Sequence, residues 1–349
     1  MVLGCADLKR SRLERIQSRF PGLRTTTDYH SLLADDAVQA VIIATPTATH
    51  ATIAREALHA GKHVLVEKPL CTTSGDALEL AALAKAKGLV LMVGHVFLFN
   101  GGIIKLRELI ANKELGCIHY LDAVRTNLGP VRGDVNALYD LGTHDLSIFN
   151  YLLSSMPASV SAHGSCISQK AIEDVCFATV QYADGTLAHL HVSWLNPRKV
   201  RTLTVVGSSK MAHWDDVDPQ DTLRLYDKGL DEPPYYDSYG EFRCLLRNAG
   251  VHVPDIRRTE PLLKQAEAFI AWVLDGSPAG PSAMEGLVVV KTLEAAMLSV
   301  RNGGAMIPID AAAPPKARTA AGDAVPLIGG SWLPSQSPNR LKATPLATR

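Results

Sequence analysis

Two short motifs combine residue types that are used in proton transfer. Glu67-Lys68-Pro69 directly follows the apolar run Val64-Leu65-Val66, and Asp140 stands four residues before His144 in the stretch DLGTHD. An ammonium group can stabilise negative charge that develops on an oxygen, and an imidazole exchanges protons near neutral pH. On a helix, residues four apart share a face, so Asp140 could orient His144 as a general acid–base pair. Taken singly, a strand-end lysine is more often a solvated charge and a helical histidine a structural group.

A third cluster lies in the stretch ATPTATH, residues 44–50, which follows another apolar run. In open α/β sheets, the loops at the carboxyl ends of strands border the crevice in which ligands bind. Thr45, Pro46, Thr47 and His50 are therefore candidate ligand contacts, although threonines here could equally be helix caps.

The elements that must position these motifs alternate between strand and helix in the first hundred residues. Helical periodicity or helix stops predict helices over 8–20, 49–61 and 74–88, and the stretch 25–36 predicts a short helix with Thr27 or Asp28 as its N-cap. Continuous apolar runs predict strands over 1–6, 38–46, 63–69 and 89–95. This alternation favours parallel strands with helices on both faces and right-handed crossovers, which is a doubly wound sheet.

After about residue 99 the pattern changes to many short strands. Strands are expected over 117–128, 158–168, 174–182, 187–195, 201–207, 210–216 and 221–227, with hairpin signals at Asp184-Gly185 and Gly207-Ser208. Helices are expected near 139–153, 261–274 and 284–302. The fold class is therefore α/β plus α+β: a dinucleotide-type domain over 1–97, a mainly antiparallel sheet domain over 98–310, and a poorly ordered tail over 311–349 that is rich in Ala, Pro, Gly and Ser.

Composition excludes several classes of partner. The 349 residues include 35 Lys plus Arg and 35 Asp plus Glu, so neither nucleic acid nor an anionic membrane surface is indicated. No apolar run approaches the ~20 residues of a membrane span, and no signal peptide is evident at Met1. The six cysteines form no C-x-x-C pair, which indicates reduced thiols, no structural metal and a cytoplasmic protein.

The combined motifs resemble the Gfo/Idh/MocA oxidoreductases, which include glucose–fructose oxidoreductase and inositol dehydrogenase. The resemblance runs over residues 1–310 and is carried by ATPTATH (44–50), AGKHVLVEKPL (60–70), VGH (93–95) and DLGTHDL (140–146). It implies a Rossmann domain, an open-faced sheet domain, a nicotinamide cofactor and a homo-oligomer, dimer or tetramer, built on the open sheet face.

The resemblance also implies roles for particular residues. Lys68 would contact both nicotinamide and substrate, His144 would transfer the proton, and Asp140 would support His144. Cofactor contacts are expected from Asp7, Thr45, Pro46, Thr47, His50, Glu67, Lys68 and His95. Asp7 ends the first strand, where an acidic residue favours NAD over NADP, while the nearby Arg10 and Arg12 leave NADP open.

Further stretches resemble the branch of this family associated with sugar nucleotides and surface polysaccharides. These stretches include DVNALYDLGTHDLSI (134–148) and HVSWLNPRKVRTLTVVGSSKM (191–211). The implied substrate is a sugar or a nucleotide-linked sugar, and besides Lys68 and His144 its expected contacts are Arg125, Asn127, Arg132, Asn136 and Tyr139. Arg198 and Lys199 are weaker candidates, and an inositol or free-sugar dehydrogenase is the alternative within the enzyme class.

One part of the family pattern is missing. A dinucleotide fold normally begins with a strand and a G-x-G-x-x-G turn, but this sequence begins in what resembles the second strand. Loss of the central first strand would leave two strands with unpaired edges. Two explanations are open: the sequence begins inside a longer protein, or the protein is a paralogue that lost its cofactor site and serves as a sugar-binding or assembly protein.

Overall fold

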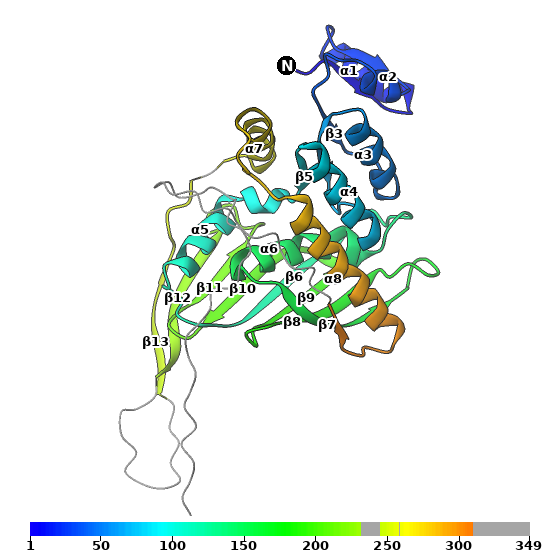
Figure 1. Ribbon diagram of the computed structural model, residues 1–349. Coiled ribbons are helices and arrows are strands. Elements are labelled where there is room, and N and C mark those ends of the chain that lie inside the picture. Colours follow the sequence, from blue (N-terminus) through cyan, green and yellow to red (C-terminus); the bar gives the residue numbers. More distant parts are fainter. Residues whose placement is uncertain (232–244, 258, 310–349) are drawn as a thin grey trace, which may run out of the picture.

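The computed structural model describes residues 1–231, 245–257 and 259–309. The tail predicted over 311–349 lies outside the described residues. Figure 1 shows an upper region built from the first hundred residues, above a large sheet that carries helices on one side.

The upper region contains two small parallel sheets. One joins β1 (Gly4–Ala6) and β2 (Arg24–Thr26), and the other has the order β3-β4-β5, with β3 (Ala40–Ile43), β4 (His63–Glu67) and β5 (Leu91–Gly94). Four α-helices alternate with these strands: α1 (Arg10–Arg19), α2 (His30–Leu33), α3 (His50–His59) and α4 (Ser74–Lys87). The predicted β-α alternation is confirmed, whereas the short polar strand β2 was not predicted because it lacks an apolar run.

β1 and β3 do not pair with each other. Among the described residues, β1 has only β2 as a strand partner and β3 has only β4. Ile42 on β3 is 62% exposed, although its sequence context is that of a covered strand. The facing edges of β1 and β3 are therefore unpaired, as the sequence pattern predicts for two strands that have no strand between them.

Local chemistry explains why the β4 and α4 segments form. Val64, Leu65 and Val66 on β4 are essentially inaccessible, as expected for a strand covered on both faces. Thr73 accepts a hydrogen bond from the backbone N–H of Asp76 at the start of α4. Gly88 ends that helix with a φ of 65°, a conformation that costs glycine little.

The lower region is a nine-stranded sheet with the order β13-β12-β11-β10-β6-β9-β8-β7-β14. Its strands are β6 (Ile118–Leu128), β7 (Pro157–Ser165), β8 (Val175–Tyr182), β9 (Leu187–Ser193), β10 (Leu195–Gly207), β11 (Met211–Asp215), β12 (Leu223–Asp231), β13 (Leu245–His252) and β14 (Ile307–Pro308). All seven predicted strands and both hairpins of this region are confirmed.

The sheet is not purely antiparallel, because β6 and β9 run parallel. The chain leaves β6, crosses over through α6 (Thr143–Leu153), and then forms β7, β8 and β9 as consecutive antiparallel strands. A helical crossover is the connection that parallel neighbours need. The prediction of a mainly antiparallel sheet therefore holds except at this central pair.

Helices cover one face of the large sheet. These are α5 (Gly101–Ala111), which was not predicted, α6, and α8 (Ala283–Arg301). Their apolar side chains and those on the covered face of the strands form the main core, around Phe149, Trp194 and Trp214. In Figure 1 the opposite face of the sheet carries no helix among the described residues.

Two helices from the end of the described chain return to the upper region. Ala283, Leu287 and Val290 of α8 pack in the core of the small sheet, and Phe269 of α7 (Pro261–Asp275) packs against Leu65 on β4. The predicted division at residue 97 thus separates the sheets but not the helices that pack on them. Within the described residues, no helix is both long and apolar enough to cross a bilayer.

Candidate active site

Lys68 lies immediately after β4 and reaches the π-helical segment that contains Asp140. Its Nζ donates hydrogen bonds to the backbone oxygen of Asp140 at 2.7 Å and to the Asp140 carboxylate at 3.3 Å. Only 15% of the Lys68 side chain is exposed. Burial lowers the pKa of Lys68, and the opposing effect of the Asp140 carboxylate is smaller.

Asp140 is held by three different donors. Besides Lys68, the Asp140 carboxylate accepts from Arg132 Nη1 at 3.1 Å and from the indole Nε1 of Trp194 at 3.2 Å. Trp194 is 1% exposed, so it is a fixed part of the core. This set of bonds places the carboxylate toward Lys68.

The predicted pairing of Asp140 with His144 is not formed in this structure. Residues Leu138–Gly142 form a π-helical turn, and α6 begins only at Thr143. A π turn breaks the four-residue repeat on which the prediction rested. Among the described residues, Asp140 makes no hydrogen bond with His144, whose Nδ1 is buried without a hydrogen-bond partner.

The environment of His144 favours its neutral form. Burial, followed by the positive charges of Lys68 and Arg125, holds the pKa of His144 well below its ordinary value. The Phe97 ring contacts the imidazole edge-on, with ring centroids 4.8 Å apart. An uncharged imidazole with an unpartnered nitrogen is the form that can accept a proton.

Arg125, predicted as a substrate contact, is occupied by an internal partner. Its guanidinium binds both oxygens of Asp145 at 2.8 to 3.1 Å, and its side chain is 3% exposed. The guanidinium also stacks over Phe97 at 4.4 Å from the ring centroid. Arg125 therefore supports the ring that touches His144, and Asn127, two residues along β6, remains half-buried.

Arg132 and Asp134 join the lower region to the predicted cofactor loop. Arg132 forms two bonds with Asp134, of 2.9 and 2.6 Å, in addition to its bond with Asp140. The backbone N–H of Thr47 donates at 3.3 Å to Oδ2 of Asp134, the oxygen that also accepts from Arg132 Nη2. Arg132 is 31% exposed, so it can still meet a ligand.

The remaining predicted cofactor contacts lie at the ends of β3, β4 and β5. One of them, His50, holds two of the loops together. Both ring nitrogens of His50 lie 2.9 Å from carbonyl oxygens, those of Pro69 and Thr45, and the residue is 1% exposed. His50 thus ties the loop after β3 to the loop after β4. Glu67 contacts Gly94 so closely that an added Cβ there would lie 3.0 Å from its carboxyl group.

His95 follows β5 and is 1% exposed. Neither of its ring nitrogens has a hydrogen-bond partner among the described residues, and burial lowers its pKa to about 3. Buried polar atoms normally have partners. Two unpartnered nitrogens close to Lys68 therefore fit a bound molecule, such as the nicotinamide cofactor of a Rossmann domain, that would supply those partners.

Asp7 lies apart from this cluster, at the end of β1. Its carboxylate accepts from the backbone N–H of Lys9 at 2.8 Å and from Arg12 at 3.1 Å. The Lys9 N–H is the largest cause that lowers the pKa of Asp7, so the group is ionised and able to accept a further hydrogen bond.

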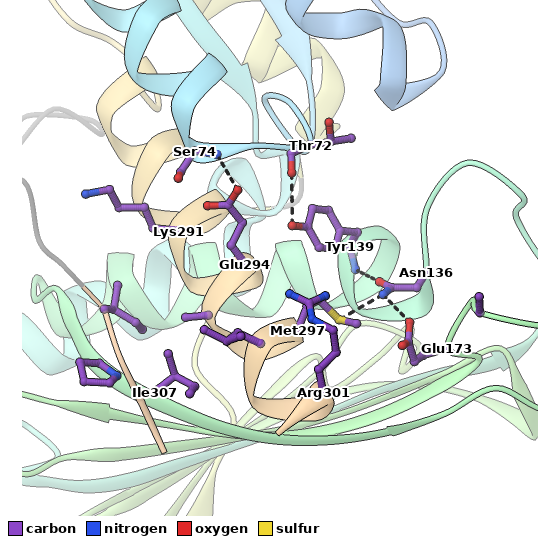
Figure 2. A pocket seen from close by; sticks show the side chains of 15 residues that line it. Thr72, Ser74, Asn136, Tyr139, Glu173, Lys291, Glu294, Met297, Arg301 and Ile307 are labelled. Atoms are coloured by element: carbon purple, nitrogen blue, oxygen red, sulfur yellow. Dashed lines mark hydrogen bonds between the residues drawn. The ribbon is translucent and has the colours of Figure 1, made fainter. Parts of the chain in front are cut away.

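Asn136 and Tyr139, predicted as substrate contacts, line a cavity beside α8. Figure 2 shows this cavity of about 930 Å³ between α8 and the segment that precedes α6. Asn136 donates to Glu173 at 2.8 Å, and the Tyr139 hydroxyl donates to the backbone oxygen of Thr72 at 3.3 Å. The cavity lining does not include Lys68, so these two residues are not gathered with the catalytic candidates.

Three neighbours of the site were missed from the sequence: Trp194, Asp145 and Phe97. Their roles depend on contacts across strands and helices, which spacing alone does not show. The only available signal was Asp145 beside His144, where a charge in an apolar helix requires a buried partner. Among the described residues, no cluster of side chains could hold a metal ion.

Comparison with known proteins agrees with this arrangement. Residues 2–95 match the family model "Oxidoreductase family, NAD-binding Rossmann fold", and residues 103–213 match "GFO/IDH/MocA C-terminal domain". UDP-N-acetylglucosamine 3-dehydrogenase of Acidithiobacillus ferrooxidans is 32% identical over 208 residues, which are 58% of this chain. The chain spans 63% of that relative's length.

Solved structures are similar over more of the chain. GenD2 from gentamicin A biosynthesis, solved in complex with NAD, is 29% identical with a TM-score of 0.74 and covers 89% of each chain. A putative oxidoreductase from Magnetospirillum magnetotacticum is 30% identical with a TM-score of 0.70, covering 84% of this chain and 90% of that one. The chain belongs to the Gfo/Idh/MocA family of oxidoreductases with an NAD-binding Rossmann fold.

Proposed function

We propose that the protein is an NAD(P)-dependent dehydrogenase that oxidises or forms a secondary alcohol on a sugar or nucleotide-linked sugar. The observation that carries this proposal is the cluster of a buried Lys68, its partner Asp140, and a His144 imidazole with an unpartnered nitrogen. This is the set of groups that alcohol oxidation needs: a charge to stabilise an alkoxide and a base to take its proton.

Each group has a defined part in the reaction. Lys68 stabilises negative charge on the reacting oxygen, and the low hydration of its surroundings strengthens that interaction. In this proposal His144 takes the hydroxyl proton, and burial favours its neutral form before the reaction. Asp140 holds the Lys68 ammonium in place rather than orienting His144.

The nicotinamide ring supplies the hydride acceptor when the cofactor is bound. The residues that would hold the cofactor are Thr45, Pro46, Thr47, Glu67, Lys68 and His95, with Asp7 at the adenosine end. His50 supports this site by fixing two of its loops. The identity of Asp7 favours NAD, and its neighbours Arg10 and Arg12 leave NADP open.

Two relatives and the partly exposed Arg132 support the proposed substrate class. One relative is named as a UDP-N-acetylglucosamine dehydrogenase, and another as a dTDP-sugar 3-reductase. Arg132 is 31% exposed next to Asp140 and suits a sugar hydroxyl, a carboxylate or a diphosphate. We infer a role in the synthesis of polysaccharides or other glycoconjugates, in the cytoplasm.

Self-association through the open face of the large sheet is part of the proposal. That face carries no helix among the described residues, and it exposes 46% of Tyr120, 44% of Phe177 and 44% of Leu187. Exposed aromatic and aliphatic groups gathered on one face are typical of protein interfaces. A dimer or tetramer would cover them.

The test is a panel of sugars, nucleotide sugars and inositols incubated with the chain and NAD or NADP, with NAD(P)H absorbance as the readout. We expect turnover with at least one nucleotide sugar and a loss of roughly 10²- to 10³-fold in Lys68→Ala. Lys85→Ala, an exposed lysine on α4, is the matched control and should keep full turnover. Undiminished turnover in Lys68→Ala would contradict the assigned role.

One observation favours a second candidate, a sugar-binding assembly protein without turnover. The sheet that would border the cofactor is divided between β1 and β3. For that candidate, the chain should bind a sugar with an affinity that does not change when NADH is added at any concentration.

A further inference from the structure

Arg201 on β10 lies beside the candidate active site. Its register partner on β6 is Arg125, so the two arginines lie side by side on the same face of the sheet. The guanidinium carbon of Arg201 is 5.8 Å from the centroid of the Phe97 ring, the ring that contacts His144 edge-on. Burial is the largest cause that holds the pKa of His144 below its ordinary value, and the positive charge of Arg201 adds to it. Arg201 therefore belongs to the surroundings of the proposed proton acceptor.

Asp216, directly after β11, holds Arg201 through only one guanidinium nitrogen. Nη1 of Arg201 donates to the Asp216 carboxylate at 3.1 Å, and the backbone N–H of Asp216 donates to the backbone oxygen of Arg201 at 3.0 Å. The other carboxylate oxygen of Asp216 accepts from the side-chain amide of Asn100 at 3.2 Å. No described residue hydrogen-bonds to Nε or Nη2 of Arg201, and 38% of its side chain is exposed. The arginine is thus fixed in place while one edge of its guanidinium stays unused.

The three arginines around the site use their donors differently. Arg125 binds the Asp145 carboxylate through Nε and Nη2, and its side chain is 3% exposed. Arg132 uses Nε, Nη1 and Nη2 to bind its two aspartates. Of these three, only Arg201 has an Nε–Nη2 edge without a partner among the described residues. The unused edge is therefore a property of Arg201 and not of every arginine in this part of the fold.

The Nε–Nη2 edge of a guanidinium is suited to a planar anion. Its two parallel N–H groups match the two oxygens of a carboxylate or of a phosphate, and bonds to a charged acceptor are about twice as strong as neutral ones. Arg125 already shows this geometry with Asp145, at 2.8 to 3.1 Å. A single sugar hydroxyl offers one oxygen and no charge. The unused edge of Arg201 thus favours an anion over a neutral hydroxyl.

We propose that Arg201 binds an anionic group of the substrate, so that the substrate is a sugar that carries a carboxylate or a phosphate and not a free neutral sugar or an inositol. This inference rests on the proposed function, because it takes the ligand of Arg201 to be the substrate of that reaction. The two oxygens that the edge requires are common to the carboxylate of a uronate and to the diphosphate of a nucleotide. Arg201 is a substrate-binding residue and takes no part in the proton transfer.

The Asp216 carboxylate distinguishes this role from a purely structural one. A bound anion and Asp216 would both lie against the Arg201 guanidinium, so their negative charges repel each other. Removing the charge of Asp216 should therefore leave anion binding as tight as before or make it tighter, whereas removing the charge of Arg201 should weaken it. An ion pair that served only the fold would respond in the same way to the loss of either partner.

The test is isothermal titration calorimetry of the full chain, without cofactor, with UDP, D-glucuronate and D-glucose. We expect the wild type to bind UDP or D-glucuronate at least about tenfold more tightly than D-glucose, and the anion that binds identifies the source. Arg201→Met should weaken that binding roughly ten- to a hundredfold, and Arg201→Lys, which keeps the charge without the fork, should lie between. Asp216→Asn should bind at least as tightly as the wild type. Arg224→Met, which breaks an ion pair with Asp218 on β12, is the matched control and should bind like the wild type.

The failures are distinguishable. Equal affinity of the wild type and Arg201→Met for the anion would overturn the inference, and so would a wild type that binds neither anion. Anion binding that weakens in Asp216→Asn as much as in Arg201→Met would show that the ion pair serves only the fold. If circular dichroism shows that Arg201→Met is unfolded, Arg201→Lys must weaken anion binding and Asp216→Asn must not. Turnover of a neutral sugar by a chain that binds no anion would overturn only the inference, whereas anion binding that depends on Arg201 without turnover of any compound would overturn only the proposed function.

Discussion

The small parallel sheet and the large mixed sheet present polar groups in opposite ways. In the small sheet, polar residues follow apolar strands, so Lys68 after β4 and His95 after β5 stand at strand ends with atoms available to a ligand. In the large sheet, Arg125 lies within β6 and its charge is taken up by Asp145. Polar groups at strand ends can thus contact a ligand, whereas Arg125, a polar group within a strand, is paired inside the protein and serves the fold.

The largest expected effect comes from breaking the internal ion pair of the large sheet. Arg125→Met leaves the Asp145 carboxylate buried without its partner, which costs roughly 3–5 kcal/mol of the free energy of unfolding. Urea denaturation followed by circular dichroism measures this loss. A change below about 1 kcal/mol would show that Arg125 is not needed by the fold.

The double variant Arg125→Met/Asp145→Leu sharpens the same point. Removing both charges leaves no unpaired group, so most of the lost stability should return. Since Arg125 also stacks on Phe97, which contacts His144, turnover should stay reduced in the double variant even when stability recovers.

Sequence patterns predicted the fold and the strand-end groups because both depend on local order. Apolar runs, helix stops and hairpin turns predicted most elements, although β2, α5, β13 and β14 were missed. The polar residues after β4 and β5 were recognised in the same way. The partners that Asp140 and Arg125 have in the structure were not predicted, for a shared reason. Their partners come from distant segments, and the π turn at Leu138–Gly142 has no signal in the spacing of Asp140 and His144.

A second comparison is between the stability of the fold at pH 7 and at pH 5, which depends on His95 after β5. His95 is held neutral by burial, with its pKa lowered to about 3 from an ordinary 6.5, so the unfolded chain binds a proton that the folded chain does not. Stability is fully present above pH 6.5 and is lost as the pH falls toward 3, by roughly 2 kcal/mol at pH 5. In His95→Leu this slope should decrease, as measured by urea unfolding at pH 7 and pH 5. An unchanged slope would contradict the assigned burial.

Asp140→Asn tests whether the carboxylate serves Lys68 or His144. Burial lowers the pKa of Lys68 and Asp140 opposes that shift, so removing its charge should lower the Lys68 pKa further. The alkaline limb of the pH profile of kcat/KM should then move to lower pH, with turnover reduced roughly ten- to a hundredfold. The rate at which acetic anhydride labels Lys68 at each pH gives the same pKa without any substrate. A shift confined to the acid limb would instead assign Asp140 to His144.

The smallest effect on stability is expected at the cavity beside α8 that Tyr139 lines. Tyr139→Phe removes one hydrogen bond to the backbone of Thr72, which should cost about 1 kcal/mol of stability. Turnover and KM should not change, because the hydroxyl is bonded to Thr72 and lines a cavity whose lining does not include Lys68. A raised KM would restore Tyr139 to the substrate site.

The central claim is that the strand ends around Lys68 bind a nicotinamide cofactor. A fluorescence titration of the full chain with NADH tests it most directly, with Lys68→Ala and Lys85→Ala titrated in parallel. We expect saturable binding in the wild type and in Lys85→Ala, and weaker binding in Lys68→Ala. No saturable binding in the wild type would contradict the claim and favour a sugar-binding protein without turnover.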